Sequence, residues 1–193
     1  MIRTLDIIFS LLGLIALSPL FVILYVAIRL ESKGGGFYSQ QRIGLHGKPF
    51  QLYKFRSMRT GADKGSLITI GADNRITKSG KFIRKYKLDE LPQLFNVLKG
   101  DMSLVGPRPE VEKYVRLYTE EQRHVLDVRP GITDYASIKY ANENDLLAQS
   151  ADPEKTYIEE IMPDKININM RYINHCNPVE YFRVIFLTIS KIV

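Results

Sequence analysis

Two adjacent carboxylates, Asp89 and Glu90, are the residues of this sequence best suited to chemistry. They open residues 87–100, where hydrophobic side chains recur at three- and four-residue intervals and predict a short amphipathic helix. Pro92 is compatible with a first helical turn, because the backbone N–H that proline lacks has no partner there, and Gly100 ends the helix. Both acids are therefore predicted to lie at the positive end of a helix dipole.

Basic residues surround the acidic pair in the sequence. The upstream cations are Arg75, Lys78, Lys81, Arg84, Lys85 and Lys87, and Arg108 follows in the Gly-Pro-Arg-Pro stretch at residues 106–109. A cation about 4 Å away stabilises a carboxylate by about 4 kcal/mol at an effective dielectric constant of about 20. We therefore expect Asp89 to stay ionised, with a pKa below the unperturbed value of about 3.9, which suits a nucleophile or a metal ligand. Because adjacent helix positions point about 100° apart, the two acids are expected to have separate roles rather than to share one proton.

Helix capping alone would also explain the pair, with Asp89 as the N-cap and Glu90 as a partner of the helix dipole. The longer stretch around the pair, residues 73–109, distinguishes better between these two explanations. Residues 73–109 contain Leu-Asp-Glu-Leu-Pro at 88–92 and closely resemble the signature block of the bacterial sugar transferases, monotopic phosphoglycosyl transferases that start glycoconjugate assembly on a polyprenol carrier. The resemblance implies that Asp89 is the nucleophile that takes a phosphosugar from a nucleotide diphosphate sugar, and that Glu90 holds Mg²⁺.

Shorter stretches extend this resemblance from about residue 18 to about Thr133. Residues 38–44 and 53–58 resemble further blocks of the family, which implies that Arg42, Lys54 and Arg56 lie near phosphates; solvated charges at a strand edge are the alternative. Residues 128–133 also resemble the family, which implies that Arg129 borders the nucleotide site. The expected phosphate-binding residues are Lys54, Arg84, Arg108 and Arg129. After Thr133 the resemblance weakens, and Ala141 occupies the place where some members have an arginine for the uridine, so the contacts with the base stay open.

The composition limits the possible partners. With 193 residues, the chain has room for one domain and an anchor. The formal net charge of +6 points to nucleic acid, an anionic membrane surface or phosphorylated substrates. The single cysteine, Cys176, excludes an intrachain disulfide and fits a reducing cytoplasmic setting. The histidines lack metal-ligand spacing, so any metal is expected to be a hard, oxygen-liganded ion such as Mg²⁺.

The uncharged run from Ile7 to Ile28 predicts a membrane segment. A straight helix of this length would measure about 33 Å, which is enough to span a bilayer. Two features favour instead a re-entrant hairpin that enters and leaves by the same face. Pro19 breaks the helical hydrogen bonding and the Ser18 hydroxyl can satisfy a freed carbonyl, and cations flank both ends of the run, so the positive-inside tendency draws both ends to the cytoplasm. A Ser-Pro break in a re-entrant helix is also implied by the family resemblance.

The remaining patterns predict the elements around the acidic pair. Two aromatic-rich stretches, 37–42 and 50–55, predict a β-hairpin, and the polar, glycine-rich residues 60–76 predict a loop over the site. A helix is expected from Pro109, with Val111, Tyr114, Val115 and Tyr118 on one face, followed by a capping box at residues 119–122. Residues 178–193 predict a last helix with a narrow polar face. A helix this apolar lies either in the core or in the membrane interface, and we expect the interface.

The sequence thus predicts a monotopic membrane enzyme of the α+β class, predominantly helical, with a re-entrant anchor over residues 1–33. The catalytic domain, residues 34–193, is expected on the cytoplasmic face of the bacterial inner membrane. The resemblance implies that Asp89 attacks the β-phosphate of a UDP-sugar and releases UMP, and that undecaprenyl phosphate then takes the phosphosugar from the aspartyl intermediate.

Membrane lipids are expected partners. Nucleic acid is not, because the chain lacks a glycine- and aromatic-rich RNA-binding signature. Two alternatives stay open: a non-catalytic, membrane-anchored module whose basic surface binds lipid or nucleic acid, and a Mg²⁺-dependent phosphatase. The motifs do not identify the sugar, the glycoconjugate pathway or the oligomeric state.

Overall fold

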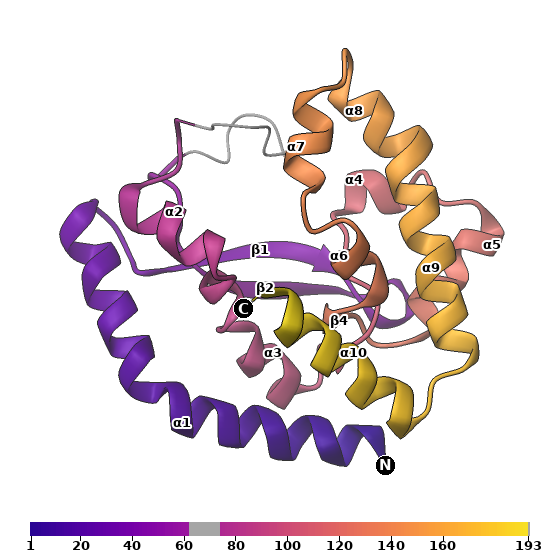
Figure 1. Cartoon of the computed structure of the whole chain (residues 1–193), viewed down its shortest axis with the longest axis horizontal. Helices are drawn as coiled ribbons and strands as arrows, with labels where there is room; N and C mark the ends of the chain where they lie inside the picture. The colour runs from indigo at the N-terminus through magenta and orange to yellow at the C-terminus, as the bar shows by residue number, and fades with distance from the viewer. Residues whose placement is uncertain (62–73, 193) are drawn as a thin grey trace.

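The computed structural model describes residues 1–61 and 74–192 and is mainly helical (Figure 1). The first half of the chain contains α1 (Ile2–Glu31), β1 (Phe37–Ile43), η1 (Leu45–Gly47), β2 (Pro49–Phe55), α2 (Lys78–Lys85), η3 (Leu88–Glu90), α3 (Gln93–Lys99) and β3 (Ser103–Val105). The second half contains α4 (Glu112–Val115), α5 (Glu120–Arg123), η4 (His124–Asp127), β4 (Gly131–Thr133), α6 (Tyr135–Lys139), α7 (Glu143–Ala148), α8 (Pro153–Thr156), η5 (Tyr157–Ile161), α9 (Met162–Asn174) and α10 (Pro178–Ile192). The predicted helical α+β class is confirmed. The loop predicted at 60–76 falls mostly on residues 62–73, which lie outside the described residues.

The strands form two small sheets. The predicted hairpin is confirmed: β1 and β2 pair antiparallel, from Phe37 opposite Phe55 to Ile43 opposite Pro49. The strands β3 and β4 pair in parallel and bring the segments that follow Val105 and Pro130 together. At this point the backbones touch, since a Cβ on Gly106 would lie 2.5 Å from the carbonyl oxygen of Arg129. Only glycine permits this approach.

α1 is one continuous helix that contains Pro19 (Figure 1). Figure 1 shows that it bends midway along its length, which an internal proline explains because it removes a helical hydrogen bond. The Ser18 hydroxyl donates to the carbonyl oxygen of Ile15 over 2.8 Å. The Ser-Pro pair therefore bends the helix without separating it into two helices. α1 is long and apolar enough to cross a membrane, and the re-entrant path through the bilayer stays a prediction.

Both ends of α1 are hydrogen-bonded to the rest of the fold. Near the N-terminus, the Arg3 guanidinium donates to the carbonyl oxygens of Val97 (2.7 Å) and Leu98 (3.1 Å), at the end of α3. The buried carboxylate of Asp6 accepts from the Ser103 hydroxyl and the Leu104 N–H, each over 2.9 Å. At the other end, the Glu31 carboxylate accepts from the backbone N–H groups of Lys78 (2.6 Å) and Ser79 (2.8 Å), at the start of α2. α1 thus contacts both helices that flank the acidic pair.

Hydrophobic packing places the second half of α1 beneath the acidic turn. Leu24 and Ile28 of α1 are buried with Phe55 of β2 and Ile83 of α2, and Leu88 and Leu91 pack against this cluster. A larger core forms around α4, η5 and α9, where Val111, Tyr114, Val115 and Tyr118 are buried as the sequence predicts. The helix predicted from Pro109 is shorter than expected: α4 covers only Glu112–Val115, with Val111 at its N-cap and Tyr118 beyond its end. The preceding segment is instead bonded to strands, through Gly106 to Thr133 and through Glu110 to Ile43.

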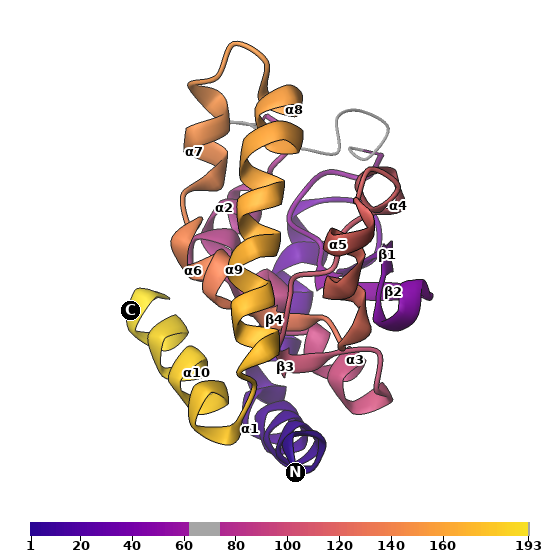
Figure 2. The same ribbon diagram turned by 90° about the vertical axis from the view of Figure 1, so that its right-hand side faces the viewer.

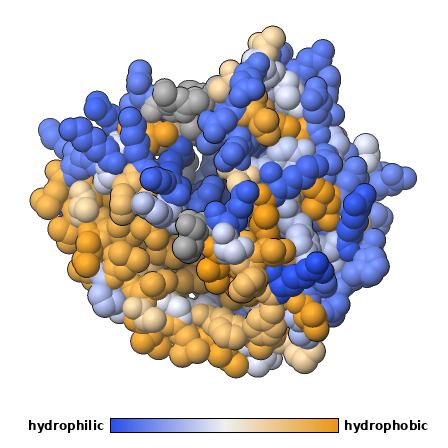
Figure 3. All heavy atoms as spheres, viewed as in Figure 1, coloured by the Kyte–Doolittle hydropathy of each residue, from blue (hydrophilic) through white to orange (hydrophobic). Residues whose placement is uncertain are grey.

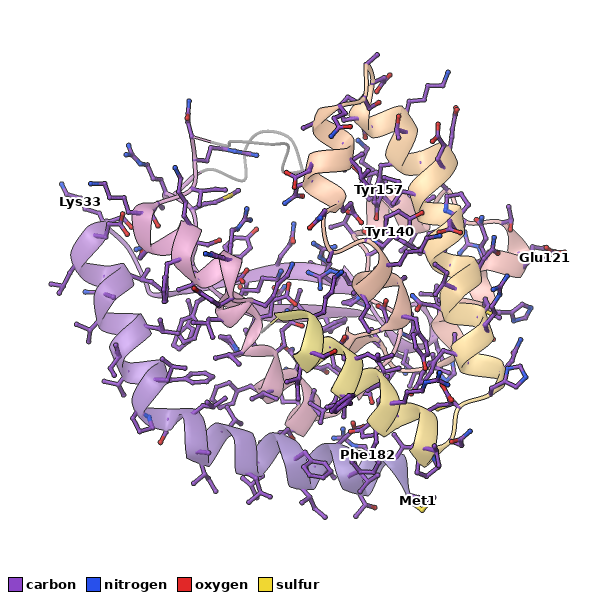
Figure 4. The ribbon with its side chains drawn as sticks, in the orientation of Figure 1. Met1, Lys33, Glu121, Tyr140, Tyr157 and Phe182 are labelled. Carbon is purple, nitrogen blue, oxygen red and sulfur yellow. The ribbon has the colours of Figure 1, made fainter. Side chains whose placement is uncertain are left out.

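One side of the molecule is covered by exposed hydrophobic side chains of α1 and α10, which we call the apolar face. Its members are Ile7, Ile8, Phe9, Leu11, Leu12, Ile15, Val22, Ile23, Val26 and Leu30 of α1, with Val179, Phe182, Phe186 and Ile189 of α10. Figure 2 shows α1 and α10 together at one end of the molecule, and Figure 3 shows hydrophobic residues along this region. Phe182 points towards α1 (Figure 4), where its ring packs edge-on against Phe9 at 5.9 Å.

α10 has the start that the sequence predicts, with the Asn177 side chain accepting from the N–H groups of Val179 and Glu180. Its other face is buried in the core through Tyr181 and Val184. The hydroxyl of Tyr181 also donates to Asp6 of α1 over 2.8 Å. α10 therefore has two apolar faces. One packs in the core of the protein, and the other is exposed beside α1.

Candidate active site

The acidic pair lies in a tight turn between α2 and α3. Lys87, just after α2, adopts a left-handed conformation (φ 56°), so α2 does not continue into the acidic turn. Leu88–Glu90 then form a 3₁₀ turn, and α3 begins only at Gln93. In a continuous α-helix the N–H of residue 92 would bond to the carbonyl of Leu88, but Pro92 has no N–H, so this bond is lost. The prediction that both acids open the α-helix itself is wrong, whereas the predicted stop at Gly100, in the left-handed conformation, is confirmed.

Glu90 is held by two cations. The Arg108 guanidinium donates from Nη2 to Oε1 over 2.6 Å and from Nη1 to Oε2 over 3.1 Å. The Lys54 ammonium, from β2, donates to Oε1 over 3.1 Å. Burial by itself would raise the pKa of Glu90, but Arg108 and Lys54 hold that pKa well below its usual range. In return the charge of Glu90 raises the pKa of Arg108. Glu90 is therefore a fixed anion.

Asp89 has the opposite surroundings. Its side chain is buried, and in the part of the chain that the structure describes no group donates a hydrogen bond to its carboxylate or forms an ion pair with it. Burial raises the pKa of Asp89, and the charge of Glu90 adds to this, although Lys54 and Arg84 act against it. The expectation of a depressed pKa is wrong because the nearest cations are engaged by Glu90 and because water is excluded. The Asp89 carboxylate thus has oxygens that accept no hydrogen bond from the described residues, and such an oxygen is available to act as a nucleophile.

Two further side chains, not identified in the sequence, hold the cations of the site. The Ser57 hydroxyl accepts from Nε of Arg84 over 3.0 Å, which directs this guanidinium from α2 towards the acidic turn. Asp134, at the start of α6, accepts from the backbone N–H of Arg108 over 2.9 Å and from that of Ser137 over 2.6 Å. Burial raises the pKa of Asp134, with the Ser137 bond opposing this. An N-cap signal at Asp134 was available in the sequence, whereas its contact with Arg108 depends on the pairing of β3 with β4.

Three predicted phosphate ligands do not reach the pair. Arg129 donates from Nε to the carbonyl oxygen of Gly100 over 2.9 Å, at the far end of α3, and borders a separate cavity of about 390 Å³. Arg56 donates to the carbonyl oxygens of Ser32 (2.9 Å) and Lys33 (2.5 Å) and so caps the end of α1. Arg42 donates to the Gln40 amide oxygen over 2.8 Å and approaches Glu110 at 3.5 Å. All three guanidinium groups donate to backbone carbonyls, in the case of Arg42 to that of Pro109 over 3.1 Å, and the sequence does not reveal these contacts. The structure thus brings Lys54, Arg84 and Arg108 to the acidic pair but not Arg129.

The oxygens of Asp89 and Glu90 are compatible with a Mg²⁺ ion that shares its coordination with a substrate. Among the described residues no group of three or more histidine, cysteine, aspartate or glutamate side chains could hold a metal without other ligands. Mg²⁺ sites in phosphate-transferring proteins need only one or two carboxylates, with phosphate oxygens and water completing the coordination. Asp89 is uncommitted, and Oε2 of Glu90 accepts from a single donor, Arg108. The chemistry of the donor set therefore fits the ion.

Comparisons with known proteins identify the family of the chain. The family model described as bacterial sugar transferase matches residues 1–193. The chain is 47% identical to an uncharacterized sugar transferase, EpsL, of Bacillus subtilis, over 72% of this chain and 69% of the relative. It is 48% identical to a putative undecaprenyl-phosphate N-acetylgalactosaminyl 1-phosphate transferase of the same organism, over 62% of this chain and 67% of the relative.

A third relative is a UDP-N-acetylgalactosamine-undecaprenyl-phosphate N-acetylgalactosaminephosphotransferase of Aeromonas hydrophila, 40% identical over 81% of this chain. The match spans only 37% of that protein's length. Relatives with names of this kind differ in the sugar, since one from Klebsiella pneumoniae is a UDP-glucose:undecaprenyl-phosphate glucose-1-phosphate transferase.

Proposed function

The chain belongs to the bacterial sugar transferase family, and we propose that it transfers a sugar 1-phosphate from a UDP-sugar to undecaprenyl phosphate. This would be the first membrane step of glycoconjugate assembly, such as that of an O-antigen, a capsule or a protein-linked glycan. The observation that carries the proposal is the asymmetry of the acidic pair. Glu90 is fixed by Arg108 and Lys54, while the neighbouring Asp89 is buried and receives no hydrogen bond from residues 1–61 or 74–192.

In the proposed reaction, a carboxylate oxygen of Asp89 attacks the β-phosphorus of the UDP-sugar. The new bond joins this oxygen to phosphorus, the bond between the β-phosphorus and the bridging oxygen breaks, and UMP leaves with the electron pair. A phosphate oxygen of undecaprenyl phosphate then attacks the same phosphorus and releases Asp89. Because a phosphate monoester is already anionic above a second pKa of about 6, this second step needs no general base. One nucleophile thus serves two displacements.

The cations around the pair supply charge where the phosphates require it. Arg84 comes from α2, Arg108 from the segment after β3 and Lys54 from β2 of the hairpin, and the charge of each acts on Asp89. Fixed positive groups of this kind stabilise the negative charge that develops during transfer and need no reorganisation. We propose that Glu90, with Asp89 beside it, holds a Mg²⁺ ion. When bound, the ion would neutralise charge on the diphosphate.

The apolar face supports a monotopic attachment. Both ends of α1 bond to one domain, through Arg3 and Asp6 at the start and through Glu31 at the end. A helix that crossed the bilayer straight would place its ends on opposite sides of about 30 Å of hydrocarbon. We therefore propose that α1 enters and leaves by the same side, with α10 in the interface and the catalytic domain on the cytoplasmic face of the inner membrane.

The proposal is tested by incubating the purified protein, in detergent, with Mg²⁺ and a panel of UDP-sugars, with and without undecaprenyl phosphate. One sugar should give continuous UMP release with the acceptor and a burst equal to the enzyme concentration without it. A non-catalytic lipid-binding module would release no UMP from any sugar, and a phosphatase would release inorganic phosphate. Either of these results would contradict the proposal.

A further inference from the structure

Gln93, the first residue of α3, carries a buried hydrogen-bond donor with no acceptor. Its side chain is 1% exposed, and Nε2 has no partner among the residues that the structure describes. A donor that has lost water without gaining an acceptor destabilises the fold. A buried donor of this kind is explained if it has an acceptor in another state of the molecule, and that acceptor must lie near Gln93.

The backbone places the Gln93 side chain beside the acidic pair. Leu91 and Pro92 both have helical φ and ψ angles, and the N–H groups of Leu94 and Phe95 bond to their carbonyls three residues back. Gln93 therefore follows Glu90 by three residues and Asp89 by four. Because the bonds in this stretch reach the third residue back, as in a 3₁₀ helix, Gln93 lies one turn after the acidic pair. The oxygens of Glu90 already accept from Arg108 and Lys54, so Asp89 is the acid of the pair that lacks a donor among the described residues.

The neighbours of Gln93 along α3 fix which way its side chain is turned. Asn96, one turn later, donates to the carbonyl oxygen of Gln51 over 2.6 Å and accepts from the N–H of Tyr53 over 3.0 Å, both on β2. Leu94 and Phe95 lie on the opposite side, against α1, where the Phe95 ring packs against Phe21 at 6.1 Å. Gln93 thus faces the hairpin strand that carries Lys54, and not the membrane helix.

Asp89 and Gln93 are complementary. Both residues are buried and lie one turn apart. Gln93 has a buried donor without an acceptor, and the Asp89 carboxylate receives no hydrogen bond from the described residues, although its oxygens are not among the fully buried atoms without a partner. The other two buried side-chain atoms without a partner in the described part of the chain are Nε of Arg56, at the end of α1, and Oδ1 of Asn169, in α9. Neither of these is beside the acidic turn.

We propose that Gln93 is a positioning residue that donates its amide N–H to one oxygen of the Asp89 carboxylate once substrate is bound, so that the other oxygen faces the phosphorus. The inference rests on the proposed role of Asp89 as nucleophile. A free carboxylate rotates about its own torsions, whereas one held by a fixed donor keeps its reacting oxygen close to the attack geometry. The gain lies in the rate of transfer and not in the binding of the UDP-sugar.

The test is Gln93→Met, which keeps the length of the side chain and removes the donor. Without acceptor lipid, we expect the rate constant of the UMP burst to fall about tenfold, equivalent to about 1.4 kcal/mol. The Kd for the UDP-sugar should be unchanged. The melting temperature should not fall, because an unpartnered buried donor has been replaced by an apolar group of similar size. Gln41→Met, the same change at an exposed position of the hairpin, is the matched control and should alter none of the three quantities.

Three results would overturn the inference: an undiminished burst rate, a weaker Kd with an unchanged burst rate at saturating substrate, or a melting temperature lowered by more than about 5 °C. A weaker Kd alone would show that the Gln93 amide binds the substrate, and a lower melting temperature would show that Gln93 serves the packing of the fold. Gln93→Leu should repeat the result of Gln93→Met without a flexible thioether. The parent protein, run in parallel, separates this inference from the proposed function, since only a parent that shows no burst contradicts the latter.

Discussion

Asp89 and Glu90 are neighbours in the chain, yet the fold gives them different surroundings. Glu90 is paired with Arg108 and Lys54, and its pKa is held well below the usual range. Asp89 is buried beside these groups, and burial raises its pKa. A buried, unpaired carboxylate costs folding energy, so its presence indicates that it is kept for chemistry. The two acids therefore make opposite contributions to stability, and each can be tested by one isosteric substitution.

Replacing the nucleophile should remove activity and stabilise the protein. Because the folded pKa of Asp89 lies above the unfolded value of about 3.9, its ionised form destabilises the fold at neutral pH. Asp89→Asn should abolish the UMP burst, leave UDP-sugar binding largely intact and raise the melting temperature at pH 7 by about 2–4 °C. The difference from the parent should shrink as the pH falls through the folded pKa of Asp89. A variant that is less stable than the parent at pH 7 would contradict this reasoning.

Replacing its neighbour should have the reverse effect on stability. Glu90→Gln leaves Arg108 and Lys54 without their counter-charge, and breaking a buried ion pair costs about 3 kcal/mol. Since the folded pKa of Glu90 lies below the unfolded value of about 4.3, its stabilisation is complete above that value and is lost as the pH falls through the folded pKa. Chemical denaturation from pH 7 to pH 3 should show this loss in the parent and not in the variant.

Activity measurements complete the test of Glu90. We expect Glu90→Gln to lose nearly all UMP release, and a chelator to abolish release by the parent. The control is Glu112→Gln, which removes the exposed Glu112–Arg116 pair and should cost less than about 1 kcal/mol. Full turnover of Glu90→Gln in the presence of chelator would exclude the proposed role in metal binding.

Among the elements, α1 and α2 are joined end to end. Glu31, from the last turn of α1, accepts from the first two N–H groups of α2, and α2 carries Arg84. Thr77 caps the same terminus by accepting from the N–H of Gly80 over 2.9 Å. α2 has only eight residues, so its first turn is a large share of the helix. α1 therefore helps to set the position of Arg84, a cation of the candidate site.

Glu31→Gln should loosen this junction without unfolding the protein. The carboxylate is solvent-exposed and its loss resembles the loss of an N-cap, which costs about 1 kcal/mol. We expect faster hydrogen exchange of the amides of Lys78 and Ser79 and a several-fold lower rate of UMP release. The control is Glu121→Gln, at an exposed glutamate that points outward on α5 (Figure 4) and should alter neither quantity. Unchanged exchange in α2 would show that the junction does not hold the helix.

For the molecule as a whole, the same helix, α1, contributes to both the apolar face and the packing beneath the active site. α1 carries exposed hydrophobic residues outward and packs Leu24 and Ile28 inward, next to Leu88 and Leu91 of the acidic turn. α10 repeats this division, with Phe186 exposed and Tyr181 buried. If α1 lies in the membrane as proposed, the site is close to the bilayer surface, where the proposed lipid acceptor would lie.

Cysteine labelling tests the path of α1. The single cysteine, Cys176, is exposed, so the background for labelling is Cys176→Ser. A cysteine introduced by Ile2→Cys should react with an impermeant reagent only after the membrane is opened, as should one introduced by Lys33→Cys at the other end of α1. Adding Pro19→Ala straightens the helix and should favour a spanning orientation. Labelling of residue 2 in intact spheroplasts, with Pro19 in place, would rule out the re-entrant path.

Local patterns in the sequence determined much of this protein. The hairpin, the stop of α3 at Gly100, the capping box at residues 119–122 and the Asn177 cap of α10 were all predicted, because each depends on residues within a few positions of one another. The acidic pair itself was found in the same way. Its cationic partners Lys54 and Arg108 were expected from the family resemblance and lie at the site.

The tertiary structure alone decided which cations are free for chemistry and what burial does to the acids. Arg56 and Arg129, like Lys54 and Arg108, are basic residues in stretches that resemble the family. The structure shows that Arg56 and Arg129 instead cap the ends of α1 and α3, where they donate to carbonyl groups of distant segments. The raised pKa of Asp89 was not predicted, because the sequence reports nearby charge but not the exclusion of water. Electrostatic energy depends on distance and dielectric surroundings, and both are set only when segments far apart in the chain pack together.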